Sequence, residues 1–152
     1  VAAWCEANKG RVHGYFTLDT LDWLVAGGRV PKAAASLTSM LGMKANLSYD
    51  LDGALTLTGV SRGRKKALKN IVKELREHYA GDPGRFIGIV DADCPDDADA
   101  LEGMVREELG ESCPRILRMA LDLTIGAHVG PGMIACAFWG VDRASVGGRG
   151  KR

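Results

Sequence analysis

Thr124-Ile-Gly-Ala-His-Val-Gly-Pro-Gly132 sets a single histidine, His128, among glycines, and an apolar run lies on each side. Glycine and proline crowd together where a backbone turns sharply and approaches another group, because a Cβ atom would obstruct the approach. The runs at 116–123 and 133–139 have the composition of strands. The sequence therefore predicts a tight corner between two strands that carries one titratable, hydrogen-bonding imidazole. A turn with a surface histidine is the alternative.

Composition limits the classes of protein. The chain has 152 residues, of which 46% are hydrophobic and 26% charged, enough for one domain with a core. A net charge of +1 provides no global field for nucleic acid or an acidic membrane. No apolar run approaches the ~18 residues of a transmembrane span. The four cysteines form no C-x-x-C pair, which indicates reduced thiols in a cytoplasmic protein; an approach of Cys94 to Cys113 is the alternative.

The first third of the chain predicts short alternating elements. Residues 1–12 read as a residual helix from a missing N-terminal domain, and 15–18 as a strand. Asp19 then caps a helix with an apolar face that Gly27-Gly28 ends. Arg29 follows directly, where it either neutralises the negative end of that helix or faces a ligand.

A helix and a hairpin follow. Pro31 suits the first turn of a helix whose apolar stripe contains Met40 and Leu41. Residues 44–51 alternate polar and apolar side chains, which predicts a half-buried strand. Asp52-Gly53 predicts a type I′ turn and hence an antiparallel return strand at 55–58.

The basic run Arg62-Gly-Arg-Lys-Lys66 leads into a helix with apolar residues at spacings of three and four. Most of its charge is therefore the solvated face of an amphipathic helix. Cations at a helix N-terminus oppose the helix dipole unless an anion or an acidic partner lies there. Arg62 and Arg64 are therefore the candidates for contact with a partner or a phosphate.

The second half predicts a central strand and then a helix. Residues 86–90 are apolar on both faces, as in a central strand. The aspartates at 91–99 surround Pro95, which indicates a helix start rather than a metal site. Residues 143–152 read as a flexible basic tail. The fold class is α/β, a two-layer domain with a mixed, about six-stranded sheet covered by helices.

Five segments together resemble the DegV family, more narrowly its C-terminal domain. They match in order and approximate spacing over residues 13–142, and they are Leu18–Val30, Met43-Lys44, Asp52-Gly53, Arg62–Ala67 and His128-Val-Gly-Pro-Gly132. The resemblance implies the DegV C-terminal α/β fold.

The same resemblance implies a fatty-acid-binding protein that is not itself an enzyme. DegV-like proteins hold a long-chain fatty acid between an N-terminal α/β domain and this domain, and some present its carboxylate to a fatty-acid kinase that makes an acyl phosphate. His128 is then expected near the carboxylate, and Arg29 and Arg62 near the head-group opening or the kinase-docking surface. No cofactor or metal is implied beyond the bound fatty acid.

Apolar side chains near these motifs are candidates for the acyl pocket. An unbranched thioether adapts to chains of different shape, and ordinary core packing is the alternative for each residue. The expected ligand-binding set is His128, Arg29, Gly130, Gly132, Met40, Met43, Ile125 and Met133, with Leu41 beside them; the partner-binding set is Arg62 and Arg64. The face toward the missing domain would be exposed and apolar, so the fragment is expected to self-associate.

Two other functions compete with a fatty-acid carrier. A phosphotransferase related to dihydroxyacetone kinases would need a nucleotide site, and the chain has no G-x-x-x-x-G-K-[ST] motif. A phosphate- or nucleic-acid-binding module could use the run at 62–66. That run lacks interleaved aromatic residues and a basic balance elsewhere.

Overall fold

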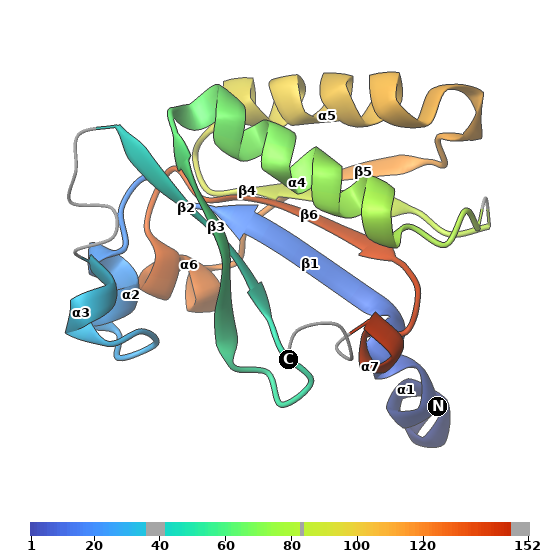
Figure 1. Ribbon diagram of the computed structural model, residues 1–152, viewed down its shortest axis with the longest axis horizontal. Helices are drawn as coiled ribbons and strands as arrows, with labels where there is room; N and C mark the ends of the chain where they lie inside the picture. Colours follow the sequence, from blue (N-terminus) through green and yellow to red (C-terminus); the bar gives the residue numbers. More distant parts are fainter. Residues whose placement is uncertain (36–41, 83, 147–152) are drawn as a thin grey trace.

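A mixed six-stranded sheet forms the centre of the molecule (Figure 1). The computed structural model describes residues 1–35, 42–82 and 84–146. The strands are β1 (Val12–Thr17), β2 (Met43–Tyr49), β3 (Leu55–Arg62), β4 (Ile87–Asp91), β5 (Ile116–Ala120) and β6 (Ile134–Trp139). Their order across the sheet is β3-β2-β1-β6-β4-β5. β4 and β5 are parallel, and the other neighbouring pairs are antiparallel, so the predicted fold class is confirmed.

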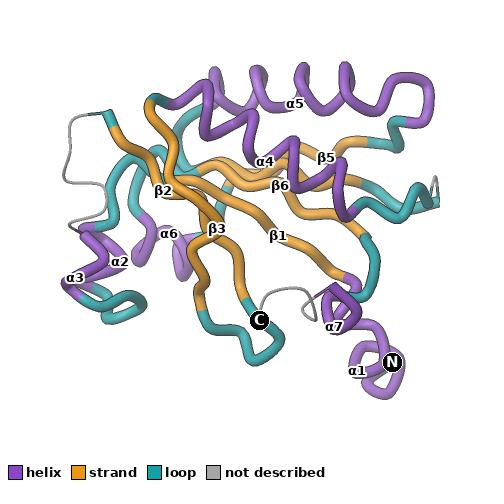
Figure 2. The backbone as a smooth tube through the Cα atoms, viewed as in Figure 1, coloured by secondary structure: helices purple, strands orange, loops and turns teal. Residues whose placement is uncertain are grey.

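Two long helices cover one face of the sheet, and short helices lie near its other face and its ends (Figure 2). The long helices are α4 (Arg64–His78) and α5 (Pro95–Leu109). The short elements are α1 (Ala2–Asn8), η1 (Lys9–Arg11), α2 (Asp22–Ala26), α3 (Lys32–Ala35), η2 (Gly110–Ser112), α6 (Leu123–Val129) and α7 (Arg143–Val146). α5 begins at Pro95 with Asp96 and Asp97 in its first turn, as the sequence predicts.

The core has a part on each face of the sheet. Between the sheet and the long helices lie Tyr15, Leu68, Ile71, Val72, Leu75, Ile87, Ile89, Ala98, Leu101, Val105, Ile134, Cys136 and Phe138. On the opposite face, the short helices α2 and α6 help to bury Phe16, Leu18, Leu21, Leu24, Ala45, Leu47, Val129 and Met133.

The strand predicted at 44–51 is confirmed as β2, but the prediction that it is half-buried is wrong, because α4 covers the polar side of β2. Asn46 and Ser48 are 3% and 7% exposed. The Asn46 amide donates a 2.9 Å hydrogen bond to the carbonyl oxygen of Ala67 in α4, and the Ser48 hydroxyl donates one of 2.9 Å to that of Gly14. The polar side chains of Asn46 and Ser48 therefore donate hydrogen bonds to buried backbone carbonyl oxygens instead of facing water.

The hairpin at Asp52-Gly53 is confirmed, but its turn is wider than type I′. The Asp50 carboxylate accepts hydrogen bonds from the amides of Asp52 (3.0 Å) and Ala54 (2.9 Å). Gly53 has a φ of +84°, whereas Asp52 is not among the residues with positive φ. An aspartate side chain therefore closes the loop that two left-handed residues would close in a type I′ turn.

Three boundaries differ from prediction. Asp19 does not cap α2, whose N-cap is Leu21; its carboxylate is engaged elsewhere. The strand predicted to run to residue 123 ends at Ala120. The predicted tail begins with a helix, in which Arg143 donates hydrogen bonds to the carbonyl oxygens of Tyr49 (2.8 Å) and Asp50 (3.1 Å).

The helix expected after Pro31 is described only as α3, so Met40 and Leu41 lie outside the described residues.

Candidate functional site

The turn after α6 makes the close approaches that its glycines predict. Gly130 and Gly132 have φ values of +70° and +81°. A Cβ atom at Gly130 would collide with the indole of Trp23, and one at Gly132 with the carboxylate of Asp19. The Gly132 amide also donates a 2.7 Å hydrogen bond to the carbonyl oxygen of Ala92, just after β4. Side chains of the same chain, rather than empty space, therefore explain both glycines.

His128 lies on a helix, so the prediction of a strand-to-strand corner is wrong. The Asp122 carboxylate caps α6 by accepting hydrogen bonds from the amides of Thr124 (2.7 Å) and Ile125 (3.2 Å), and these bonds lower the pKa of Asp122. A capped turn of helix outweighs the strand-like composition that precedes it. The half-buried His128 ring packs against Gly27 at the end of α2, where a Cβ atom would meet its Nδ1 atom.

Arg29 and His128 meet at the same residue. The exposed Arg29 guanidinium donates a 2.6 Å hydrogen bond to the carbonyl oxygen of Gly27. This contact places a cation at the negative end of α2, which is the structural role expected for Arg29. Because Gly27 also contacts the imidazole, both predicted head-group residues lie at the carboxyl end of α2. Their contact with a ligand stays a prediction.

Arg64 is engaged inside the protein, and its predicted contact with a partner stays a prediction. Its Nη2 donates a 2.5 Å hydrogen bond to the carbonyl oxygen of Gly132, and its Nε pairs with Asp97 Oδ2 at 2.8 Å. Asp19 Oδ1 lies 3.7 Å from Nη1, and the same oxygen pairs with Lys44 Nζ at 2.7 Å. A cation at the N-terminus of α4 is unfavourable with respect to the helix dipole unless an acidic partner is present. For Arg64 that partner is supplied by Asp97 and Asp19 of the same chain. No local motif predicts this cluster, because its members come from five separate segments.

An apolar hollow of about 530 Å³ opens beside the turn. Its lining residues are Trp23, Ala92, Asp93, Leu121, Asp122, Leu123, Gly126, Ala127, Gly130 and Pro131. Leu123 is 92% exposed and Trp23 is 48% exposed, so large apolar side chains at this end meet solvent. Sequence reasoning missed both. Trp23 carried a signal, because it lies off the apolar stripe of its helix, where a large aromatic residue is unusual.

The residues predicted to line an acyl pocket do not line this hollow. Met133 is 6% exposed and belongs to the core, while Ile125 is 49% exposed on α6. Met43 is half-buried at the start of β2. Burial makes Met133 a packing residue, and a role in ligand contact for these side chains stays a prediction.

Arg62 ends β3 beside a basic hollow of about 420 Å³. The side chain is exposed, and the lining also contains Gly63, Arg64, Lys65, Lys66 and Lys69. Five of the lining side chains are cationic and none is acidic, which makes this surface suitable for an acidic group on a partner. Contact between Arg62 and a partner therefore stays a prediction. Arg64 also lines the hollow, but its side chain is only 18% exposed.

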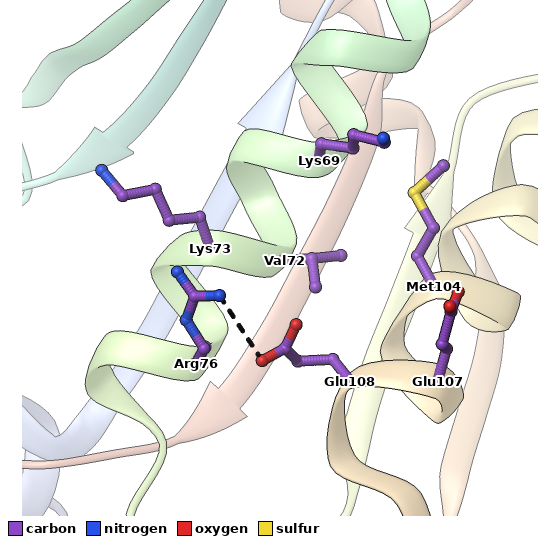
Figure 3. Close-up of a pocket in the computed structure, with 7 residues that line it drawn as sticks. All are labelled: Lys69, Val72, Lys73, Arg76, Met104, Glu107 and Glu108. Atoms are coloured by element: carbon purple, nitrogen blue, oxygen red, sulfur yellow. Dashed lines mark ion pairs between the residues drawn. The ribbon is translucent and has the colours of Figure 1, made fainter.

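Another hollow, of about 490 Å³, lies between α4 and α5 on the other side of the sheet (Figure 3). Lys69, Lys73 and Arg76 of α4 and Glu107 and Glu108 of α5 are among its lining residues. Arg76 Nη1 lies 3.8 Å from Glu108 Oε1, so the two rims partly neutralise one another. A charged groove of this kind does not suit an apolar ligand.

The described residues hold few groups suited to other chemistry. Among them, no three His, Cys, Asp or Glu side chains gather in a way that could hold a metal ion. Cys5, Cys94, Cys113 and Cys136 are free thiols. In the described part of the chain, no helix has the length and apolar character needed to cross a bilayer.

Sequence comparisons identify relatives over nearly the whole chain. A family model described as an uncharacterised protein of the DegV family matches residues 1–140. A DegV domain-containing protein of Clostridium perfringens is 36% identical over 140 residues, which cover 92% of this chain and 47% of the relative. One from Streptococcus pyogenes serotype M3 is 35% identical over 132 residues, which cover 86% and 44%. The chain thus spans about half the length of the curated relatives it matches.

Solved structures share the fold. A DegV family protein of Eubacterium eligens loaded with heptadecanoic acid superposes with a TM-score of 0.78 at 22% identity, over 91% of this chain and 49% of that one. The Streptococcus pneumoniae fatty acid kinase B3 protein, loaded with linoleic acid, gives 0.78 at 20% identity over 91% and 48%. A fatty-acid-binding DegV family protein of Thermus thermophilus gives 0.74 at 28% identity over 92% and 49%.

Proposed function

The chain belongs to the DegV family, and on that premise we propose that it forms one half of a protein that binds a long-chain fatty acid. The observation that carries the proposal is the apolar hollow of about 530 Å³ beside the turn at Gly130 and Gly132. Solved relatives from Eubacterium eligens, Streptococcus pneumoniae and Thermus thermophilus hold or bind fatty acids, which supports the same ligand class here.

The hydrocarbon chain supplies the driving force for binding. Each methylene that leaves water contributes about 0.8 kcal/mol, so a long acyl chain gains a large hydrophobic free energy. Leu121, Leu123 and Trp23 offer apolar surface at the hollow. Leu123 and Trp23 are exposed to solvent. Contact with an acyl chain or with a covering domain would remove that surface from water.

The carboxylate needs polar partners, because a bare charge in an apolar site is costly. His128 is the donor that we assign to it, and Arg29 is the nearby cation at the head-group opening. Both contact Gly27, so a single carboxylate at the end of α2 lies within reach of either side chain. Gly130 and Gly132 shape the adjacent turn.

The rest of the pocket comes, in this proposal, from a second domain. The chain spans about half of its relatives, and we assign residues 13–142 to the C-terminal domain and residues 1–12 to the connection with an N-terminal one. Leu123, at 92% exposed, is an apolar side chain that such a domain would cover. The isolated 152-residue chain should self-associate through this surface.

We further propose that the protein presents the carboxylate to a separate fatty-acid kinase and catalyses no reaction itself. The basic hollow at Arg62, Lys65 and Lys66 offers the docking surface. No cofactor is required besides the fatty acid. The four free thiols are in keeping with a cytoplasmic protein.

Mass spectrometry of an organic extract tests the proposal. The natural protein, with whatever sequence flanks these 152 residues, is purified under native conditions, and the 152-residue chain is purified beside it. A stoichiometric fatty acid in the former and none in the latter supports binding at a domain boundary. No lipid in either sample contradicts the carrier function.

A further inference from the structure

The two long helices, α4 and α5, run in the same direction on one face of the sheet (Figure 1). Arg64 in the first turn of α4 pairs with Asp97 in the first turn of α5, and Arg76 near the end of α4 pairs with Glu108 near the end of α5. Each helix has fifteen residues and is therefore about 22 Å long. Their outer sides together form one elongated surface.

The two helices carry opposite charges. α4 contains six lysine and arginine residues and two glutamates, whereas α5 contains six aspartates and glutamates and one arginine. Both helices are fully described, and the ion pairs recorded between them are Arg64–Asp97 and Arg76–Glu108. A basic ridge therefore lies beside an acidic ridge, although the whole chain has a net charge of only +1.

A groove runs between the two ridges. The hollow of about 490 Å³ in Figure 3 shares Met104 and Glu107 with a second hollow of about 600 Å³, which also contains Arg64 and Asp97 of the first turns. The small and apolar residues along these hollows are Leu68, Val72, Ala100, Gly103 and Met104. A Cβ atom at Gly103 would meet nothing within 4 Å, so no other part of the described chain covers α5 there.

The arrangement of charge selects the kind of partner. Packed helices lie about 8–10 Å apart, which is about one Debye length at physiological salt. A nucleic acid or an anionic bilayer attracted to α4 would therefore also meet the carboxylates of α5. The surface suits a partner that carries an acidic ridge and a basic ridge side by side.

A second copy of this chain has both ridges at the required spacing. Rotation by half a turn about an axis that lies parallel to the helices and midway between them places α4 of each copy over α5 of the other. An axis perpendicular to the helices would instead place α4 over α4. Charge complementarity thus selects one orientation, and the twofold symmetry repeats every favourable contact.

We propose that the protein forms a twofold dimer through α4 and α5, in which the four helices make a bundle. A surface of roughly 22 by 20 Å on each copy buries roughly 900 Å² in total, which is less than a stable interface needs. The dimer is therefore weak and reversible, and salt dissociates it because its attraction is between charges. The inference goes beyond the proposed function and does not depend on it, since α2 and α6 lie near the other face of the sheet.

Analytical ultracentrifugation of the natural protein, with its flanking sequence, tests the inference. We expect a dimer whose Kd rises at least about tenfold between about 20 mM and about 500 mM NaCl. Arg76→Glu and Glu107→Arg should each raise the Kd at low salt at least about tenfold, because each places like charges opposite one another twice. An equimolar mixture of the two variants should recover the dimer, since the two reversals compensate one another across the interface.

Lys32→Glu is the matched control, because it makes the same change in charge as Arg76→Glu at an exposed position in α3. It should leave the Kd unchanged. A monomer at low salt, a dimer that neither reversal weakens, or a mixture that does not recover overturns the inference. Binding to phosphatidylglycerol vesicles that Arg76→Glu abolishes, without a dimer, would also overturn it and assign α4 to a membrane. The fatty-acid content of the same samples reports separately on the proposed function.

Discussion

Arg64, the first residue of α4, donates a 2.5 Å hydrogen bond to the carbonyl oxygen of Gly132, 68 residues further along the chain. The same guanidinium pairs with Asp97 in the first turn of α5. One side chain thus ties the two long helices to the turn beside the candidate site. Its side chain is 18% exposed, so these contacts are largely shielded from water.

Arg64→Lys should destabilise the protein, although it keeps the positive charge. A lysine cannot reach Gly132 and Asp97 together, because it lacks the planar fork of the guanidinium. We expect a loss of about 1–3 kcal/mol in the free energy of unfolding, measured by urea denaturation. The neighbouring Lys65→Gln, at an exposed position, should stay within about 0.5 kcal/mol. Equal stabilities for the two variants would show that the three-way contact contributes little.

Gly130→Ala should also be costly, for two reasons. The residue has a φ of +70°, and an added methyl group would displace the Trp23 indole. The expected loss is about 1–3 kcal/mol. Gly103→Ala is the matched control, because Gly103 lies inside α5 with open space around it; it should gain up to about 1 kcal/mol. If Gly130→Ala left the free energy of unfolding unchanged, the turn would be able to relax around the methyl group, and the structure would not require glycine there.

Stability should fall on acidification because of His13. This side chain is 1% exposed, its Nε2 lies 2.7 Å from the carbonyl oxygen of Val141, and its Nδ1 has no hydrogen-bond partner among the described residues. Burial, with help from the nearby His78 and Arg143, lowers the pKa of His13 below 6.5, although the Val141 carbonyl and Asp142 act in the opposite direction. Below about pH 6.5 the unfolded chain binds a proton that the folded protein refuses, so stability decreases as the pH falls.

The measurement is the free energy of unfolding from about pH 7.5 down to about pH 5. His13→Phe should flatten the slope, which for one group is at most about 1.4 kcal/mol per pH unit. Glu74, whose pKa burial raises, contributes the opposite sign at the acid end of this range, since its protonated form is favoured in the folded state. Glu74→Gln removes this opposing contribution, so the free energy of unfolding should fall more steeply as the pH decreases. A slope unaltered by His13→Phe would assign the acid sensitivity to other groups.

The long elements and their order were accessible from the sequence because they depend on local patterns. The apolar spacing of α4, the Pro95 start of α5 and the Asp52-Gly53 hairpin each carry their own signal within a few residues. The polar residues Asn46 and Ser48 were misassigned because only the packing of α4 decides that their face is buried. The cluster around Arg64 depends on residues that the fold brings together from distant positions, which no window of sequence contains.

Arg62→Glu should impair coupling to a kinase and leave fatty-acid affinity unchanged within about twofold. The side chain lies at the basic hollow with Lys65 and Lys66, away from Gly27 and its two contacts. Reversal of a rim charge mainly slows association with an acidic partner, so acyl phosphate formation at low salt should fall about tenfold. Lys73→Glu, in α4 but outside that hollow, controls for the change in net charge. Lost fatty-acid affinity in Arg62→Glu would instead assign the residue to the ligand pocket.

His128→Ala should weaken retention of the fatty acid without unfolding the domain. The imidazole is half-buried against Gly27, whereas the core of this face consists of other side chains, among them Leu24 and Val129. Loss of one hydrogen bond to a charged carboxylate costs about 1.5–3 kcal/mol, which corresponds to roughly a 10- to 150-fold higher Kd. The decisive comparison uses a fatty alcohol of the same length, which lacks the carboxylate: its affinity should be almost the same in both proteins. Equal losses for acid and alcohol, or a collapse of the thermal transition, would make the imidazole a structural contact of α2 and α6 and remove it from the ligand.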